Sequence, residues 1–186
     1  YRRVKYGIGS YSDCSRRCLS RGNIGDACVI NIYEMNLLLS TYCDMILSTK
    51  MGNWQGHASV SKFLYLISII EAIDYQNLTE NEIHIEDVSL RKRFGQLYEQ
   101  YYGNSKGYGV QFYIRPFYHL GSSEYYHLVW KCDDRPQLTV HTPSEKYLRE
   151  YLLYAKFDEE LWKILQDAES REFIRRNIIT RYLIKQ

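Results

Sequence analysis

Several features that would narrow the function are missing from this sequence of 186 residues. Its five cysteines follow no metal-binding pattern, because no second Cys/His pair accompanies Cys14 and Cys18 at zinc-finger spacing. No apolar run is long enough to span a bilayer, and no signal peptide opens the chain. The sequence therefore predicts a cytoplasmic protein with free thiols, no metal or other cofactor, and no membrane partner.

No single sign of charge dominates the chain either. Its 24 lysines and arginines nearly balance its 22 aspartates and glutamates. Residues 1–34 hold six of the basic residues and three of the acidic ones, so the remainder is close to neutral. A neutral body argues against coating nucleic acid at random, but it leaves room for a local basic groove.

What the chain has in excess is tyrosine, with 19 residues. A tyrosine side chain buries a large area and keeps a polar tip. The excess therefore fits contact surfaces as well as a core, and the composition does not choose between them.

The organised part of the chain begins after an irregular N-terminal stretch. Residues 1–34 show no sustained hydrophobic period, so we expect them to form a peripheral or poorly ordered extension. We expect residues 35–186 to form a single α+β domain. Asn36 is predicted to cap its first helix, and Gly52 and Gly56 to bracket a loop.

The middle of the sequence predicts helices followed by a small sheet. The stretch SVSKFLYLISIIEAID is apolar nearly all round, which is typical of a helix at the centre of a domain. Asp87 is predicted to cap the next helix. Residues 111–140 form the one strand-rich region, with turns at 121–123 and 133–136. With helices predicted from Ser144, Asp158 and about Glu169, the fold class is mostly helical α+β with a small antiparallel sheet.

Two histidines, His119 and His127, stand in the repeated triplet Tyr-His-Leu. They could be metal ligands, a general base or part of the core. No Asp, Glu or Cys of matching geometry accompanies them, and no nucleophile with an orienting partner is identifiable. We expect this segment to form a hairpin around residues 121–123, with the two histidines in the core near its polar edge.

Basic residues offer the other candidate site. Lys62 is expected in the first turn of the central helix, where the helix dipole gives a cation no stabilisation. Arg91, Lys92 and Arg93 form a short basic run, and Arg115 precedes Pro116. Solvent-exposed side chains would explain each of these, and so would contacts with a polyanion.

The order of four segments adds a family resemblance. SKFLYLISIIEAI, RPFYHL, YYHLVW and FDEELWKILQDAESREFIRRNIITRYL resemble, in this order, a DNA-binding domain found N-terminal to HNH restriction endonucleases. That wider family includes the sulfur-binding domains that recognise phosphorothioate DNA. The resemblance covers about residues 42–183, and the HNH half of those proteins has no counterpart in this sequence.

The resemblance implies roles for particular residues. Lys62 matches a basic position that the family directs toward the DNA backbone. Arg115, Pro116 and His119 fall on the segment that lines the cup around the sulfur in sulfur-binding members. A phosphorothioate sulfur is softer and less hydrated than oxygen, so an apolar wall such as the Pro116 ring can distinguish it. Nearby cations would neutralise the phosphate charge.

These observations favour a non-catalytic DNA-binding module of a bacterial restriction or defence system. Its partners would be double-stranded DNA, with or without a modification, and a separate nuclease. One alternative is a small metal-dependent nuclease, although Glu145-Lys146 lacks the intervening residue of a Glu-x-Lys motif. The other is a protein-interaction subunit that uses a tyrosine-rich surface.

Overall fold

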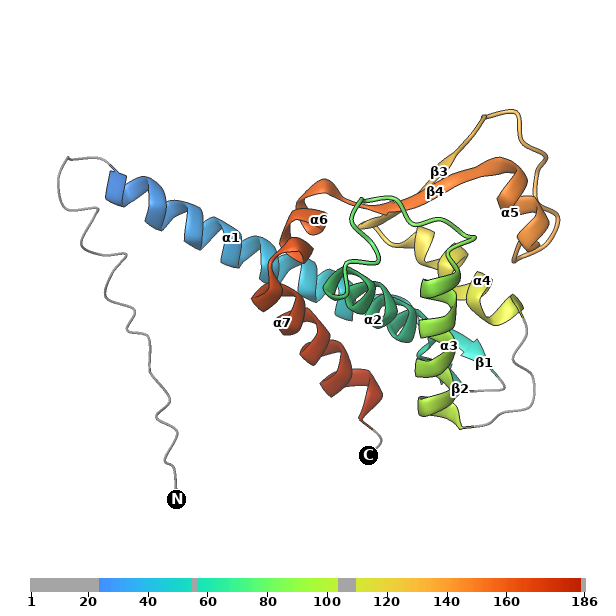
Figure 1. Cartoon of the computed structure of the whole chain (residues 1–186), viewed down its shortest axis with the longest axis horizontal. Coiled ribbons are helices and arrows are strands. Elements are labelled where there is room, and N and C mark those ends of the chain that lie inside the picture. The colour runs from blue at the N-terminus through green and yellow to red at the C-terminus, as the bar shows by residue number, and fades with distance from the viewer. Residues whose placement is uncertain (1–23, 55–56, 104–109, 185–186) are drawn as a thin grey trace, which may run out of the picture. The chain divides into compact units, whose positions relative to one another are not determined.

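A computed structural model describes residues 24–54, 57–103 and 110–184 (Figure 1). The chain divides into two compact units, residues 1–38 and 39–186. Helix α1 (Ile24–Leu47) runs through this division, so the predicted helix start at Asn36 is wrong. No proline interrupts residues 24–47 and the only glycine there, Gly25, stands in the first turn, so nothing in the sequence ends a helix before Asn36.

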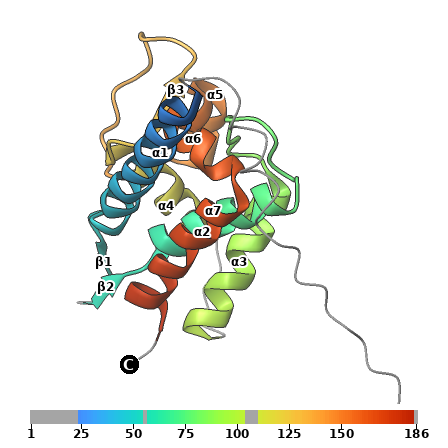
Figure 2. The same ribbon diagram turned by 90° about the vertical axis from the view of Figure 1, so that its left-hand side faces the viewer.

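Helix α2 (Ser61–Asp74) is the centre of the second unit, as the sequence predicted. Every residue from Lys62 to Ile73 is buried. The helix packs against four others, which Figure 2 shows around it: α3 (Val88–Tyr102), α4 (Val110–His119), α6 (Glu159–Gln166) and α7 (Ala168–Ile178). Full burial of each Leu or Ile stabilises the fold by roughly 1.5–3 kcal/mol, so the apolar residues of α2 contribute strongly to core stability.

Two aspartates at predicted helix starts differ in what their side chains bind. Asp87 caps α3, because its carboxylate accepts a hydrogen bond of 2.9 Å from the backbone N–H of Leu90. Asp158 precedes α6 but does not cap it with its side chain. That carboxylate instead accepts hydrogen bonds from His127 Nε2 at 2.5 Å and from the Tyr42 hydroxyl at 3.2 Å.

The predicted hairpin around residues 121–123 is wrong. Residues 110–119 form helix α4, followed by a 3-10 turn, η1 (Leu120–Ser122). Within residues 111–140, the described structure has one strand, β3 (Tyr126–Trp130). It pairs with β4 (Leu152–Phe157), which the sequence placed in a helix. The aromatic and branched residues that favour a strand also recur at helical spacing, so α4 and the start of η1 bury them in the core: Tyr113, Ile114, Phe117 and Leu120.

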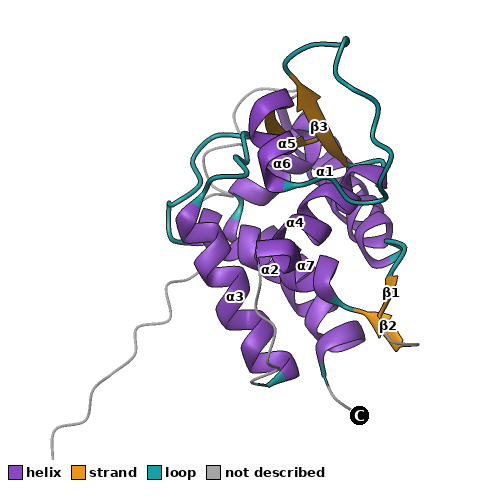
Figure 3. Cartoon of the chain, turned by 90° about the vertical axis from the view of Figure 1, so that its right-hand side faces the viewer, coloured by secondary structure: helices purple, strands orange, loops and turns teal. Residues whose placement is uncertain are grey.

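Two small antiparallel pairs supply the β-structure, and the predicted mostly helical α+β class is confirmed (Figure 3). One pair, β1 (Gly52–Trp54) with β2 (His57–Ser59), forms where a loop was expected. The other is β3 with β4. Beside it, Ile83 forms an antiparallel bridge with Ala155.

Tyr65 of α2, Tyr113 of α4 and Tyr126 of β3 belong to the core. The Tyr65 and Tyr126 hydroxyls lie 3.0 Å apart, and both side chains are fully buried. The Tyr65 ring meets Phe94, Tyr113 and Phe117 edge-on. These residues account for part of the excess of tyrosine by packing.

A long loop, residues 131–144, joins β3 to α5 (Glu145–Tyr151) and lies over α4, as its contacts with His119 show (teal in Figure 3). Among the described helices, none is both long and apolar enough to cross a bilayer.

Candidate functional site

A pocket of about 620 Å³ opens where the start of α2, helix α4, strand β1 and the loop 131–144 meet. Four residues singled out in the sequence line it together: Lys62, Arg115, Pro116 and His119. The other lining residues include one more lysine, a second histidine and several hydroxyl groups: Lys50, His141, Ser59, Ser61, Ser122 and Thr142. We call this the cationic pocket.

Helix α2 sets the position of Lys62. The helix starts directly after β2 and Val60, and the Val60 backbone N–H donates to the Tyr102 hydroxyl at 3.2 Å. Lys62 therefore stands in the first turn and is only 8% exposed. Its side chain forms no hydrogen bond or ion pair within the described part of the chain. Burial, and then the nearby charge of Lys50, lower the pKa of Lys62.

Helix α4 supplies the opposite wall of the pocket. Arg115 and His119 are four residues apart, which places them on one face of the helix. Arg115 is exposed and forms no ion pair with a described carboxylate. Between them Pro116 is buried, and its ring lacks the N–H that would bond to the previous turn. The result is an apolar surface next to a cation.

His119 connects α4 to the loop. Its Nε2 lies 2.8 Å from Thr142 Oγ1, and its ring stacks on His141 with centroids 4.5 Å apart. Burial lowers the pKa of His119 to about 4, with smaller contributions from His141, Lys62 and Arg115. The imidazole is therefore neutral at pH 7, and it acts as a hydrogen-bonding group rather than as a cation.

The chemistry of the pocket is that of an anion site. None of the described residues that line it is an aspartate or a glutamate. Lys50, Lys62 and Arg115 supply positive charge, and the serine and threonine hydroxyls supply donors of the kind that hold phosphate oxygens. The start of α2 adds the positive end of a helix dipole. The described residues hold no group of three His, Cys, Asp or Glu side chains that could bind a metal.

His127 has a different role from His119. It lies on β3, and its Nε2 is 2.5 Å from the Asp158 carboxylate at the start of α6. The two histidines therefore do not share a strand hairpin.

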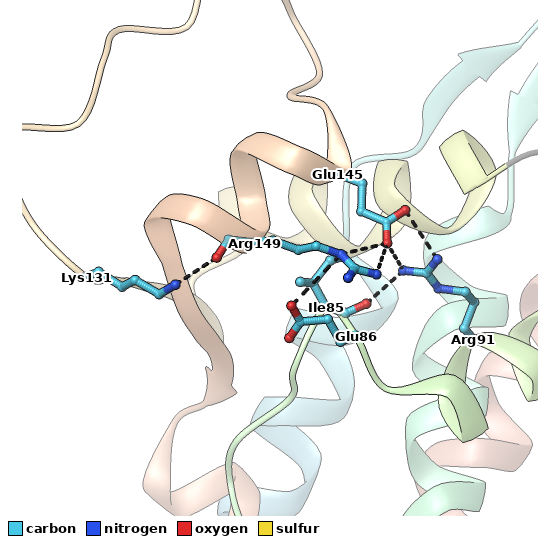
Figure 4. Close-up of polar contacts among 6 residues, drawn as sticks. All are labelled: Ile85, Glu86, Arg91, Lys131, Glu145 and Arg149. Atoms are coloured by element: carbon cyan, nitrogen blue, oxygen red, sulfur yellow. Dashed lines mark hydrogen bonds and ion pairs between the residues drawn. The ribbon is translucent and has the colours of Figure 1, made fainter.

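The basic run 91–93 is not part of the pocket. Arg91 donates to both oxygens of Glu145, at 2.9 and 3.3 Å, and to the backbone carbonyl of Ile85 (Figure 4). Arg93 forms a bidentate pair with Glu71. Lys92 is exposed. Two of the three cations are thus already neutralised by carboxylates within the fold.

Sequence reasoning missed several pocket residues, among them Lys50, Ser59, His141 and Thr142. Each lies at the end of an element or in a loop, where no hydrophobic period fixes its direction. Their place next to α4 follows from tertiary packing alone.

No protein-family model matches this chain, and no curated protein sequence matches it.

Proposed function

We propose that this protein is a DNA-binding module of a bacterial restriction or defence system, acting on double-stranded DNA in the cytoplasm. In this proposal the cationic pocket receives a backbone phosphate, and a separate nuclease cuts the DNA.

One observation carries the proposal. Lys62 and Arg115 are far apart in the sequence and on different helices, yet both line the same pocket without a carboxylate partner among the described residues. Buried cations are normally paired, because an unpaired charge away from water is costly. A site that leaves the Lys62 ammonium without a partner is suited to an anion that arrives from outside.

The shape of the pocket fits a phosphate on a polymer. Lys62 lies at the buried floor, whereas Lys50 and Arg115 are exposed. A phosphodiester can reach the floor while its neighbours remain near the two exposed cations. Each contact of this kind releases counterions, which makes the affinity depend on salt.

The wall of the pocket favours a modified backbone. Pro116 and Phe112 present apolar surface beside Arg115. A phosphorothioate keeps the negative charge but replaces one oxygen by a larger, less hydrated sulfur, which gains from contact with such a surface. We therefore propose that the preferred ligand is phosphorothioate DNA.

The test is a binding titration with matched phosphorothioate and ordinary duplexes. Replacing Lys62 by Ala should weaken both duplexes and lower the salt slope of binding by about one unit. Replacing Pro116 by Ser should cost about 1–2 kcal/mol for the modified duplex and leave the ordinary duplex nearly unchanged. Lys163→Ala, at an exposed lysine outside the pocket, is the matched control.

Three outcomes would change this view. Equal losses on both duplexes for Pro116→Ser would mean that the ring only shapes α4. No binding to either duplex in low salt would remove the DNA proposal and favour a protein-interaction subunit. Cutting of plasmid by the purified protein with Mg²⁺ or Mn²⁺ would favour the metal-dependent nuclease.

A further inference from the structure

A second pocket, of about 480 Å³, adjoins the cationic pocket. The two share His119 and Ser122, and the second continues along Tyr118, Leu128, Trp130 and Arg135. Its volume falls in the range of roughly 300–1,000 Å³ that is usual for small-ligand sites. Since the pockets share part of their walls, one ligand can extend from the first into the second.

Trp130 presents a flat aromatic ring that its neighbours hold in place. The residue ends β3, and its ring meets Tyr147 of α5 edge-on, with centroids 6.4 Å apart. The Arg135 guanidinium carbon lies 4.3 Å from the Trp130 ring centroid. Aromatic rings and stacked guanidinium planes are the surfaces on which unpaired nucleobases stack.

Arg135 has hydrogen-bonding capacity that the fold does not use. Within the described part of the chain it forms no ion pair and donates no hydrogen bond, and its stacking on Trp130 is the contact that orients it. A guanidinium carries five N–H donors in a planar fork. Those donors suit the acceptor atoms at the edge of a nucleobase, such as O6 and N7 of guanine.

Among the described residues, acidic side chains lie near the second pocket but not in its lining. Asp158, beside the lining residue His127, is held by hydrogen bonds from His127 and Tyr42, whereas Asp133 and Asp134, which precede Arg135 in the loop, are exposed to solvent. The environment of Trp130 and Arg135 therefore suits a neutral, polar aromatic ring attached to a phosphate.

Resting on the proposed function, we propose that the second pocket binds an unpaired nucleobase whose own phosphate lies in the cationic pocket. A base inside an intact duplex is covered on both faces, so only a base that has left the stack can enter a concave site. Together the two pockets would hold one nucleotide, with phosphate at Lys62 and Arg115 and base at Trp130 and Arg135.

The experiment compares three duplexes of one sequence: fully paired, with one unpaired nucleotide, and with one abasic nucleotide at the same place. The abasic duplex keeps the local flexibility but has no base to stack. We expect the unpaired base to raise affinity about 5- to 150-fold over the other two, which corresponds to roughly 1–3 kcal/mol per stacked base. Trp130→Ala and Arg135→Ala should each remove most of this gain, Trp130→Phe should restore part of it, and Lys163→Ala should leave it unchanged.

The possible failures are distinguishable. If the full chain binds all three duplexes equally, and Lys62→Ala weakens all three, the base pocket is overturned and the phosphate site stands. If it binds none of them, the proposed function falls as well. If Trp130→Ala and Arg135→Ala weaken the three duplexes alike, these residues contact the backbone and not a base. Arg135 lies in a loop outside the core, so its variant should stay folded even if Trp130→Ala does not.

Discussion

Lys62 combines two opposing effects in one side chain. Burial lowers its pKa, which means that the fold tolerates the charged form less well than water does. At pH values between its lowered pKa and the ordinary pKa of 10.5, Lys62 binds more protons in the unfolded chain than in the native one. At neutral pH the charge therefore subtracts from stability. A residue kept at such a cost is more consistent with ligand binding than with packing.

Replacing Lys62 by Met tests this directly. The variant should bind duplex DNA more weakly and yet unfold at a higher temperature, with a gain of roughly 0.5–2 kcal/mol, because an uncharged chain of similar length fills the same place. Thermal unfolding and a duplex titration measure the two effects. Lys163→Met, at an exposed position, should change stability by less than about 0.5 kcal/mol. A destabilised Lys62→Met would mean that the ammonium group supports the fold.

His119 should make stability depend on pH in a defined window. Its pKa is lowered to about 4, so between pH 6.5 and 4 the unfolded chain binds a proton at this histidine and the native chain does not. Stability should therefore fall as the pH drops from 6.5 toward 4, by about 1–2 kcal/mol once solvent screening is allowed for.

The His119→Gln variant should lose this dependence between pH 6.5 and 4.5, where most carboxylates are still ionised. Urea unfolding at several pH values measures it. His84→Gln, at an exposed histidine, should keep the slope of the original protein. An unchanged slope in His119→Gln would assign the effect to other groups.

At the scale of elements, the Arg91–Glu145 pair joins two helices. Glu145 stands at the start of α5, Arg91 in the first turns of α3, and Arg149 adds a second cation to the same carboxylate (Figure 4). Hydrogen bonds from Arg91 lower the pKa of Glu145, the larger effect, and those from Arg149 add to it. The pair therefore stabilises the fold at pH values above the ordinary glutamate pKa. This stabilisation is lost as the pH falls through the lowered pKa of Glu145.

Replacing Glu145 by Gln should destabilise the protein by roughly 1–3 kcal/mol at pH 7, because Arg91 stays partly buried without its partner. The loss should shrink in acid, where the original carboxylate is protonated too. Chemical unfolding at two pH values checks both statements. Glu80→Gln, at an exposed glutamate, should have little effect, and an equal loss there would point to net charge instead.

Sequence patterns predicted the elements whose local and tertiary signals agree. The central helix and the Asp87 cap are of this kind. The prediction for helix α4 is wrong, because Tyr113, Ile114 and Phe117 suit a strand by propensity and a helix by spacing. The packing of α4 against α2 decided in favour of the helix.

The candidate site was predictable only in part. Local sequence features single out Lys62, Arg115, Pro116 and His119, the family resemblance groups them, and they line one pocket. Arg91 was named from local charge alone. Its carboxylate partner, Glu145, is far along the chain, and no local pattern reveals such a pair.

At the scale of the whole chain, the folded unit should keep its stability when residues 1–34 are removed. A chain that starts at Met35 should unfold within a few degrees of the full-length protein, because it keeps the α1 residues that the described part of the structure buries: Tyr42, Cys43, Ile46 and Leu47. Removing residues through Leu47 should prevent folding, since each lost core side chain costs about 2–5 kcal/mol. Circular dichroism melts of both truncated chains check this. A large loss of stability on removing residues 1–34 would show that they support the fold.

The hydrogen-bonded tyrosine pair in the core gives this protein an optical signature in alkali. Burial raises the pKa of Tyr65 and of Tyr126 well above that of a free phenol. Surface tyrosines should lose their protons near pH 10, with the ultraviolet absorption of phenolate rising smoothly and reversibly. The buried pair cannot follow until the core opens, so the absorption should rise a second time, abruptly, when the chain unfolds. A spectrophotometric titration would thus record the opening of the core without any label.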